Sequence, residues 1–158
     1  MIDEHDLRIR ILANYLDLEP EDEEEYEYLF EEGRYDYGSL CNGNEEYLVL
    51  TDSEADDAAE EYIMDSLWAF NAGFLSYWTD MPEQVFTALQ DLCEESNDTI
   101  KQLLGNNIDD FIADAISSDG RGYFISSYDG DEEEWSAPDS WKDTLYHTDE
   151  VWYIYRVN

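Results

Sequence analysis

The sequence predicts an α+β fold in which three to four helices pack on a small antiparallel sheet, made of an N-terminal hairpin and C-terminal strands. Two observations lead to this class: apolar residues at helical spacing in the middle of the chain, and short β-rich runs beside glycine-containing turns towards both ends. Of the 158 residues, 43% are hydrophobic and 15% aromatic, which is enough to fill one core. We therefore expect a single acidic domain over residues 1–158.

The N-terminal part of the chain combines a short amphipathic helix with a strongly acidic segment. Residues 3–18 carry Leu7 and Ile11 at helical spacing, and a proline follows them. Nine of the fourteen residues 19–32 are acidic, a composition that is typical of disorder. The aromatic residues of this segment can nevertheless anchor it on the domain.

Strands are expected towards both ends of the chain. Residues 34–50 predict a β-hairpin, because two β-rich runs flank Asn-Gly-Asn at positions 42–44. Residues 123–128 and 151–157 predict two further strands, and a turn follows the first of them. The polar residues 132–150 between them predict a long loop.

Three helices are expected in the middle of the chain. The first covers residues 53–74, where Thr51 and Glu54 form one of two overlapping capping signals. The others cover residues 82–104 and 108–117. In the first two helices, apolar residues share one face and acidic residues the other. The two acidic rows are Glu54, Asp57, Glu61 and Asp65, and Glu83, Asp91, Glu94 and Asp98.

The charge balance is far from that of an ordinary domain. The chain has 42 Asp plus Glu against 7 Lys plus Arg, a formal net charge of −35. Such a surface repels nucleic acid and anionic membranes, so the natural partner is cationic. Over an expected surface of about 8,000 Å², this is roughly one net charge per 230 Å², about half the density on duplex DNA. Four arginines are expected to act as internal counter-charges between acidic elements: Arg8, Arg10, Arg121 and Arg156.

No group of residues stands out as catalytic or metal-binding. His5 and His147 lack metal-ligand spacing, and Cys41 and Cys93 form no CxxC pair. Carboxylate pairs are too frequent to indicate a general acid or base, and the acidic turn at residues 129–134 departs from the EF-hand pattern. We therefore expect no enzymatic activity, cofactor or metal, while cation binding by this turn remains open.

Three segments of the chain resemble a group of small acidic proteins encoded in bacteriophage genomes, most of them without an assigned function. The segments are YLVLTDSEADDAAEEYIMDSLWAFNAGFL, DGRGYFISSYDGDEEE and the final YIYRVN. In size and acidity alone, the chain is similar to DNA-mimic antirestriction proteins of phages and plasmids and to acidic anti-CRISPR proteins. No functional residue is carried over from that second similarity, because it is compositional.

The expected function is that of a DNA mimic, which occupies the cationic nucleic-acid groove of a host defence protein such as a restriction enzyme or a CRISPR effector. Carboxylates four residues apart on a helix are about 6 Å apart, close to the spacing of phosphates along a DNA strand. The alternative is an acidic adaptor or chaperone-like protein that binds a basic protein without imitating nucleic acid; halophilic adaptation is a third explanation. The expected partner-binding residues are the two helical rows together with Glu23, Glu24 and Glu25.

Direct binding to nucleic acid or to a membrane is not expected, and homodimerisation remains open. The N-terminal MIDEHDLRIRI carries charges where a signal peptide has an apolar run, and no stretch approaches the length of a membrane span. Cys41 and Cys93 are expected to be buried free thiols, which fit a reducing compartment. With the phage resemblance, these features predict the cytoplasm of an infected or lysogenic bacterial host cell.

Overall fold

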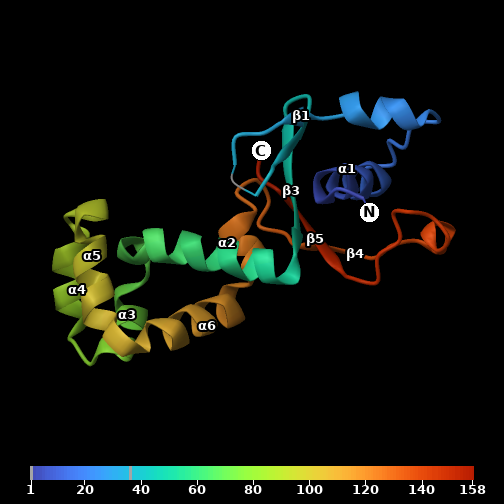
Figure 1. Cartoon of the computed structure of the whole chain (residues 1–158). Helices are drawn as coiled ribbons and strands as arrows, with labels where there is room; N and C mark the ends of the chain where they lie inside the picture. The colour runs from blue at the N-terminus through green and yellow to red at the C-terminus, as the bar shows by residue number, and fades with distance from the viewer. Residues whose placement is uncertain (1, 36) are drawn as a thin grey trace. The chain divides into compact units, whose positions relative to one another are not determined.

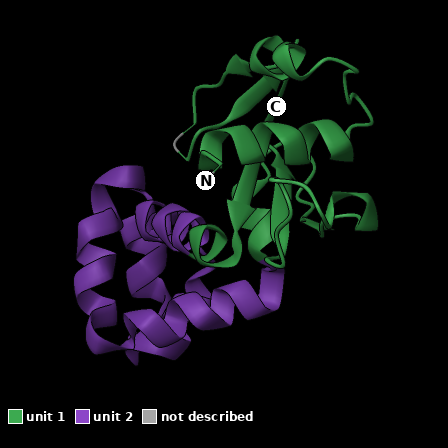
Figure 2. Ribbon diagram, turned by 45° about the vertical axis from the view of Figure 1, so that its right-hand side comes forward, with its two compact units in different colours: residues 1–56, 121–158 green, residues 57–120 purple. Residues whose placement is uncertain are grey.

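The computed structural model describes residues 2–35 and 37–158, which form an α+β fold (Figure 1). The described residues contain seven α-helices and a five-stranded antiparallel sheet, so the class is confirmed, whereas the expected three to four helices are too few. The chain divides into two compact units (Figure 2). Unit 1 comprises Met1–Asp56 and Arg121–Asn158, and unit 2 comprises Asp57–Gly120. In the part of the chain that is described, no helix has the length and apolarity needed to cross a membrane.

The sheet belongs to unit 1 and has the strand order β1-β2-β3-β5-β4, with antiparallel neighbours. The expected hairpin is confirmed, since Asn42 pairs with Glu45 across a two-residue loop. Gly43 in that loop has a φ of 64°, a conformation that glycine adopts readily. The C-terminal strand lies inside the sheet. The strands are β1 (Glu31–Glu32), β2 (Leu40–Asn42), β3 (Glu45–Thr51), β4 (Glu133–Trp135) and β5 (Trp152–Arg156).

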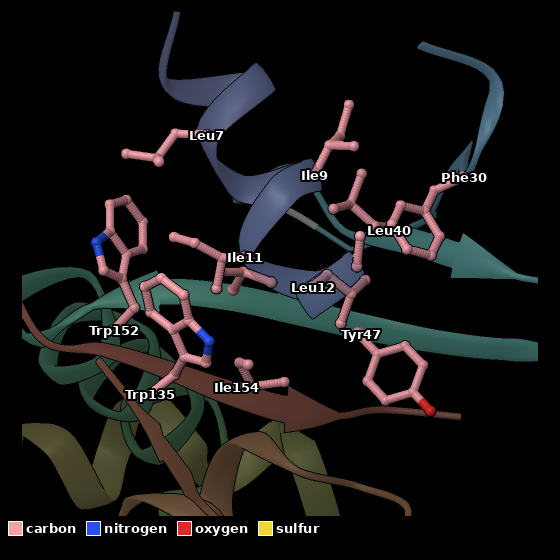
Figure 3. Close-up of a cluster of buried hydrophobic side chains, with 12 residues drawn as sticks. Leu7, Ile9, Ile11, Leu12, Phe30, Leu40, Tyr47, Trp135, Trp152 and Ile154 are labelled. Atoms are coloured by element: carbon pink, nitrogen blue, oxygen red, sulfur yellow. The ribbon is translucent and has the colours of Figure 1, made fainter. Parts of the chain in front are cut away.

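Helix α1 (Glu4–Tyr15) covers one face of the sheet and confirms the first expected helix (Figure 3). The side chain of Asp3 caps it by accepting a backbone hydrogen bond at 2.8 Å. Its residues Ile11 and Leu12 are fully buried in a cluster that includes Trp152. Burial of this apolar face is the main reason the helix docks on the strands.

The acidic segment 19–32 is attached to this cluster by its apolar residues, as expected. It contains the 3-10 helix η1 (Glu23–Tyr28) and strand β1. Phe30 belongs to the buried cluster, and the partly buried Tyr26 packs against it. The carboxylates of η1 remain at the surface.

Helix α2 (Asp52–Asp65) begins with the predicted capping box. The backbone N–H of Glu54 donates to Thr51 Oγ1 at 3.3 Å, and the N–H of Thr51 donates to Glu54 Oε1 at 2.9 Å. Two backbone donors that have no partner inside the helix are thereby satisfied.

The expectation that this helix continues to residue 74 is wrong. It ends at Asp65, and η2 (Leu67–Ala69) and α3 (Ala72–Thr79) follow. Asn97 stabilises the break, because its side chain donates to the carbonyl of Met64 at 2.7 Å and accepts from the N–H of Trp68 at 3.2 Å. These two side-chain hydrogen bonds thus satisfy backbone groups that lose their helical partners where α2 ends.

The second expected helix, over residues 82–104, is also divided. It consists of α4 (Glu83–Gln90), η3 (Cys93–Ser96) and α5 (Asn97–Leu104). Cys93 has a φ of 52°, which interrupts the helix. As a result, Leu92 and Cys93 are exposed and do not lie on the expected core face. Helix α6 (Ile108–Asp119) follows as expected, and the helices of unit 2 together contribute the buried side chains Ile63, Leu67, Leu75, Phe86, Ile100, Leu104 and Phe111.

The strand expected at residues 123–128 is wrong, because helix α7 (Arg121–Ile125) occupies this part of the chain. Gly122 packs so closely on the following turn that an added Cβ would lie 2.5 Å from the carbonyl oxygen of Gly130. This packing outweighs the β propensity of the aromatic residues. The long loop expected over residues 132–150 is corrected as well, since it contains β4 and the 3-10 helix η5 (Asp139–Trp141).

Two leucine substitutions test the burial of unit 2. Leu67 is 0% exposed and Leu92 is 55% exposed. We expect Leu67→Ala to lower the free energy of unfolding by about 2–5 kcal/mol, because it removes buried methyl groups and leaves a cavity. Leu92→Ala is the matched control and should cost under about 0.5 kcal/mol. Equal losses in chemical denaturation would contradict the packing described for unit 2.

Candidate functional site

The acidic row predicted on α2 does not have a uniform environment. Asp57, Glu61 and Asp65 are exposed and lie four residues apart on one stripe of the helix. Glu54, by contrast, has only 27% of its side chain exposed and accepts a hydrogen bond from Arg8 Nη2 at 2.8 Å. Together with its contacts in the capping box, this pair gives Glu54 a structural role within unit 1.

The electrostatics of Glu54 follow from these contacts. Burial raises its pKa, but the hydrogen bonds from Arg8 and Thr51 outweigh burial and hold the pKa below its usual value. Arg8 is 7% exposed, and its guanidinium also donates to the carbonyl of Val49 and lies 5.0 Å from the ring centre of Trp152. One buried arginine therefore joins α1, β3 and α2.

The second predicted row is exposed but does not form a single helix face. Glu83 is in α4, Asp91 is its C-terminal cap, Glu94 is in η3, and Asp98 is in α5. Because the chain changes direction at Cys93, helical spacing alone does not set the distances between these carboxylates.

The third predicted group, Glu23, Glu24 and Glu25, forms the exposed first turn of η1. Glu23 differs from the other two because it pairs with Arg10 and accepts a hydrogen bond from Tyr146 at 3.3 Å. The hydrogen bond from Arg10 is the main reason that the pKa of Glu23 is lowered.

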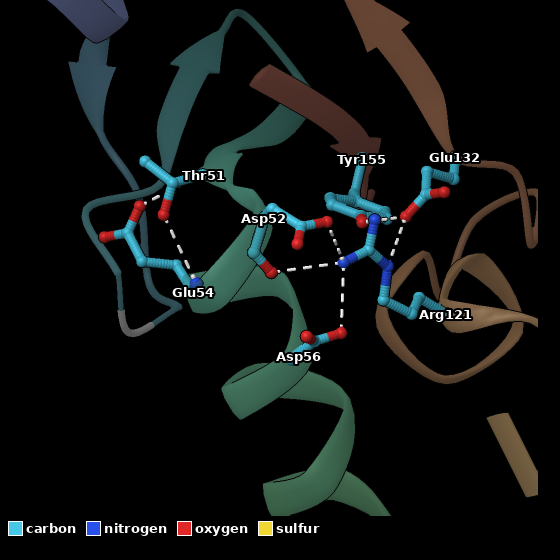
Figure 4. A network of polar contacts seen from close by, with 7 residues as sticks. All are labelled: Thr51, Asp52, Glu54, Asp56, Arg121, Glu132 and Tyr155. Carbon is cyan, nitrogen blue, oxygen red and sulfur yellow. Dashed lines mark hydrogen bonds and ion pairs between the residues drawn. The ribbon is translucent and has the colours of Figure 1, made fainter. Parts of the chain in front are cut away.

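Arg121 lies at the centre of a network of polar contacts within unit 1 (Figure 4). Its guanidinium contacts Asp52 at 2.9 Å, Asp56 at 3.1 Å and Glu132 at 2.8 Å, and lies 4.5 Å from the ring centre of Tyr153. Desolvation by burial opposes the charge, but the hydrogen bonds and the surrounding negative charges raise the pKa of Arg121 overall. Asp56 and Arg121 also mark the two points where the chain leaves and re-enters unit 1.

All five arginines of the sequence lie in unit 1, and each forms at least one ion pair there. The expectation that Arg8, Arg10, Arg121 and Arg156 act as internal counter-charges is therefore confirmed.

The charge balance of unit 2 differs from that of unit 1. Unit 2 has fourteen Asp and Glu residues against the single cation Lys101, and thirteen of these carboxylates are exposed. One lysine can neutralise few of them, so the surface of unit 2 is strongly negative.

The residues considered for catalysis are not assembled into a catalytic group in the described structure. The side chain of His147 contacts Asp149 at 3.0 Å, and His5 and Cys93 are exposed. Cys41 Sγ donates to Glu46 at 3.4 Å, and its pKa is raised, mainly by burial. A thiol with a raised pKa is a poor nucleophile.

In the acidic turn at residues 129–134, the side chain of Asp129 is hydrogen-bonded to neighbouring residues. Asp129 accepts hydrogen bonds from Ser126 Oγ at 2.6 Å and from the backbone N–H of Asp131 at 3.0 Å. The bond from Ser126 is the largest cause of the lowered pKa of Asp129. Among the described residues, no group of three or more His, Cys, Asp or Glu is arranged to hold a metal ion.

Sequence reasoning missed two features of these sites. Arg10 stacks between Tyr26 and Tyr146, at 3.9 Å and 3.6 Å from their ring centres, and nothing in the spacing of these three residues signals the contact. Asn97, which stabilises the break after α2, gave no sequence signal either.

No protein-family model, curated protein or solved structure matches the chain.

The network around Arg121 gives a stability test. We expect Arg121→Ala to lower the free energy of unfolding by about 1–3 kcal/mol, because three carboxylates then repel one another without a cation. Lys142→Ala removes the same charge from an exposed residue and should cost under about 0.5 kcal/mol. If both variants lose the same stability, the effect is one of net charge and the network is not important.

A pH series tests the paired state of Glu54. A carboxylate with a lowered folded-state pKa stabilises the fold above its unfolded-state pKa of about 4.3, and this contribution is lost as the pH falls through the folded-state value. Glu54→Gln should therefore cost about 1–3 kcal/mol near neutral pH, and the difference from wild type should shrink below about pH 4. The control Glu60→Gln, on an exposed residue of the same helix, should stay within about 0.5 kcal/mol. A difference for Glu54→Gln that does not vary with pH would contradict the role of its charge.

Proposed function

We propose that this protein is a DNA mimic, which binds the cationic nucleic-acid groove of another protein and excludes nucleic acid from it. The observation that carries the proposal is the distribution of charge. The arginines are engaged inside unit 1, while unit 2 has fourteen carboxylates and only Lys101 to neutralise them. This excess of negative charge can attract a cationic surface of another protein.

The charge density supports this proposal. A net charge of −35 on an accessible surface of 9678 Å² is about one charge per 280 Å². Duplex DNA has roughly one charge per 110 Å² of its cylindrical surface. The protein thus averages about two fifths of the density on DNA, slightly less than expected from the sequence.

Spacing on α2 is a second support. Asp57, Glu61 and Asp65 repeat every four residues, which is a rise of about 6 Å along a helix axis. Phosphates along one DNA strand have a similar separation. Cationic side chains placed for phosphates can therefore meet these carboxylates in turn, and long-range attraction accelerates the encounter.

The class of target follows from the resemblance to phage-encoded acidic proteins and is part of the proposal. Restriction enzymes, CRISPR effectors and other defence proteins of a bacterial host contain cationic nucleic-acid grooves. In this proposal the chain acts stoichiometrically and has no catalytic role. An adaptor that joins basic proteins without blocking a groove is the outcome that the following experiment distinguishes.

Competition with DNA tests the proposed function. The tagged protein is incubated with bacterial extract, and proteins that remain bound are purified and mixed with the chain and a labelled duplex of about 20 base pairs. We expect the duplex and the chain to displace each other at constant salt, because both occupy the same groove. A captured protein that binds both at once with unchanged affinities would contradict the proposal and favour an adaptor.

A charge-neutral variant tests the stripe on α2. Asp57→Asn, Glu61→Gln and Asp65→Asn together remove three exposed charges and should leave the fold intact. We expect affinity for the captured protein to fall about threefold to 150-fold, since three exposed charge pairs contribute about 0.2–1 kcal/mol each. The control removes three exposed charges from unit 1, at Asp139, Asp143 and Glu150. Equal losses in the two variants would show that only net charge matters.

A further inference from the structure

A surface pocket of about 630 Å³ lies within unit 1, between the first turns of α1 and the 3-10 helix η1. Its lining combines apolar side chains such as Ile9 and Leu145, the aromatic Tyr26 and Tyr146, several carboxylates and one cation, Arg10. Leu145 is 80% exposed although it is apolar. An open pocket with apolar, aromatic and negative walls suits a ligand that has both an aliphatic stem and a positive end.

One guanidinium already shows what the aromatic walls recognise. Arg10 lies over the ring of Tyr26 at 3.9 Å and over that of Tyr146 at 3.6 Å, and it pairs with Glu23. A planar cation between two aromatic faces is a favourable arrangement. Glu23 also accepts a hydrogen bond from the hydroxyl of Tyr146, and this bond fixes the position of that ring in the pocket wall.

Arg10 neutralises only part of the pocket. Five carboxylates line it, and one of them, Glu23, forms an ion pair with Arg10. Among the described residues, no ion pair involves Asp6, Glu24 or Glu27. Glu24 and Glu27 are three residues apart in a 3-10 helix, so they lie above one another on the same side of η1. The pocket therefore offers a pair of aligned carboxylates from η1 and a further one from α1.

We propose that this pocket receives an arginine side chain of the partner protein, an inference that rests on the proposed function and adds one anchoring contact to it. The incoming guanidinium lies between the carboxylates of Glu24, Glu27 and Asp6, and its aliphatic stem packs on Leu145. Arginine fits better than lysine because its planar group can pair with two carboxylates at once. The pocket thereby selects a groove that is rich in arginine.

Titration with capped tripeptides tests the pocket without any partner. The probes are acetyl-Gly-Arg-Gly-amide and acetyl-Gly-Lys-Gly-amide, followed by the backbone NMR shifts of the labelled full chain. We expect saturable shifts centred on residues of α1 and η1, with the arginine probe binding at least threefold more tightly than the lysine probe. Equal affinities for the two probes, or shifts spread over all acidic segments, would overturn the proposal.

Two variants and a control locate the contact. Glu24→Gln with Glu27→Gln should weaken the arginine probe at least fivefold, and Leu145→Ser should weaken it about twofold, without a change in the Arg10 contacts. Asp109→Asn with Asp110→Asn removes the same charge from exposed residues of unit 2 and should change the affinity less than twofold. Equal weakening by the two double variants would overturn the assignment.

Binding to the protein captured in the competition experiment distinguishes failure of the pocket proposal from failure of the proposed function. Glu24→Gln with Glu27→Gln should weaken its binding, while binding that remains still competes with DNA. Unchanged affinity with intact competition would overturn the pocket as an anchor and leave the proposed function standing. If wild-type protein and DNA do not compete at all, the proposed function itself fails.

Discussion

Repulsion among carboxylates is offset in unit 1 by a small number of guanidinium groups, and the local structure depends on where they lie. Arg8 is nearly buried and connects α1, β3 and α2 through Glu54, the carbonyl of Val49 and the ring of Trp152. Arg121 holds three carboxylates near the start of α2. A charged group with this little exposure is stabilising only where it is well paired, and both arginines meet that condition.

The internal ion pairs of the arginines also determine which charges remain at the surface. Every guanidinium contributes to an ion pair within unit 1, and only Arg34 has most of its side chain exposed. The outward surface therefore has little positive charge to attract nucleic acid. Unit 2 uses another solution, since its buried apolar side chains support helices whose exposed positions are acidic. The two units thus tolerate negative charge in different ways: ion pairs with arginine offset it in unit 1, and unit 2 has a buried apolar core but no arginine. A partner that supplies cations would relieve repulsion in both.

Local signals in the sequence predicted the elements that depend on local chemistry. The capping box of Thr51 and Glu54, the hairpin loop at Gly43 and the amphipathic α1 are examples. The break after α2 was not predictable, because Asn97 supplies hydrogen bonds from a distant part of the sequence. Helix α7 was missed for a similar reason, since the packing of Gly122 on Gly130 overrides a strand-like composition.

For the candidate site, the sequence predicted which carboxylates are exposed but not which of them form internal ion pairs. The acidic residues of α2 and η1 are exposed, apart from Glu54, whose contact with Arg8 joins residues 46 positions apart. Periodicity identifies the outer face of a helix, but it does not show which carboxylate forms an ion pair with an internal arginine. The central claim, that the remaining carboxylates act in place of phosphates, is tested most directly by the salt dependence of affinity for a captured protein. From about 50 mM to about 200 mM salt, the logarithm of the association constant should fall linearly with the logarithm of salt concentration, with a slope comparable to that of the same protein binding duplex DNA. An affinity that stays constant over this range would contradict the account.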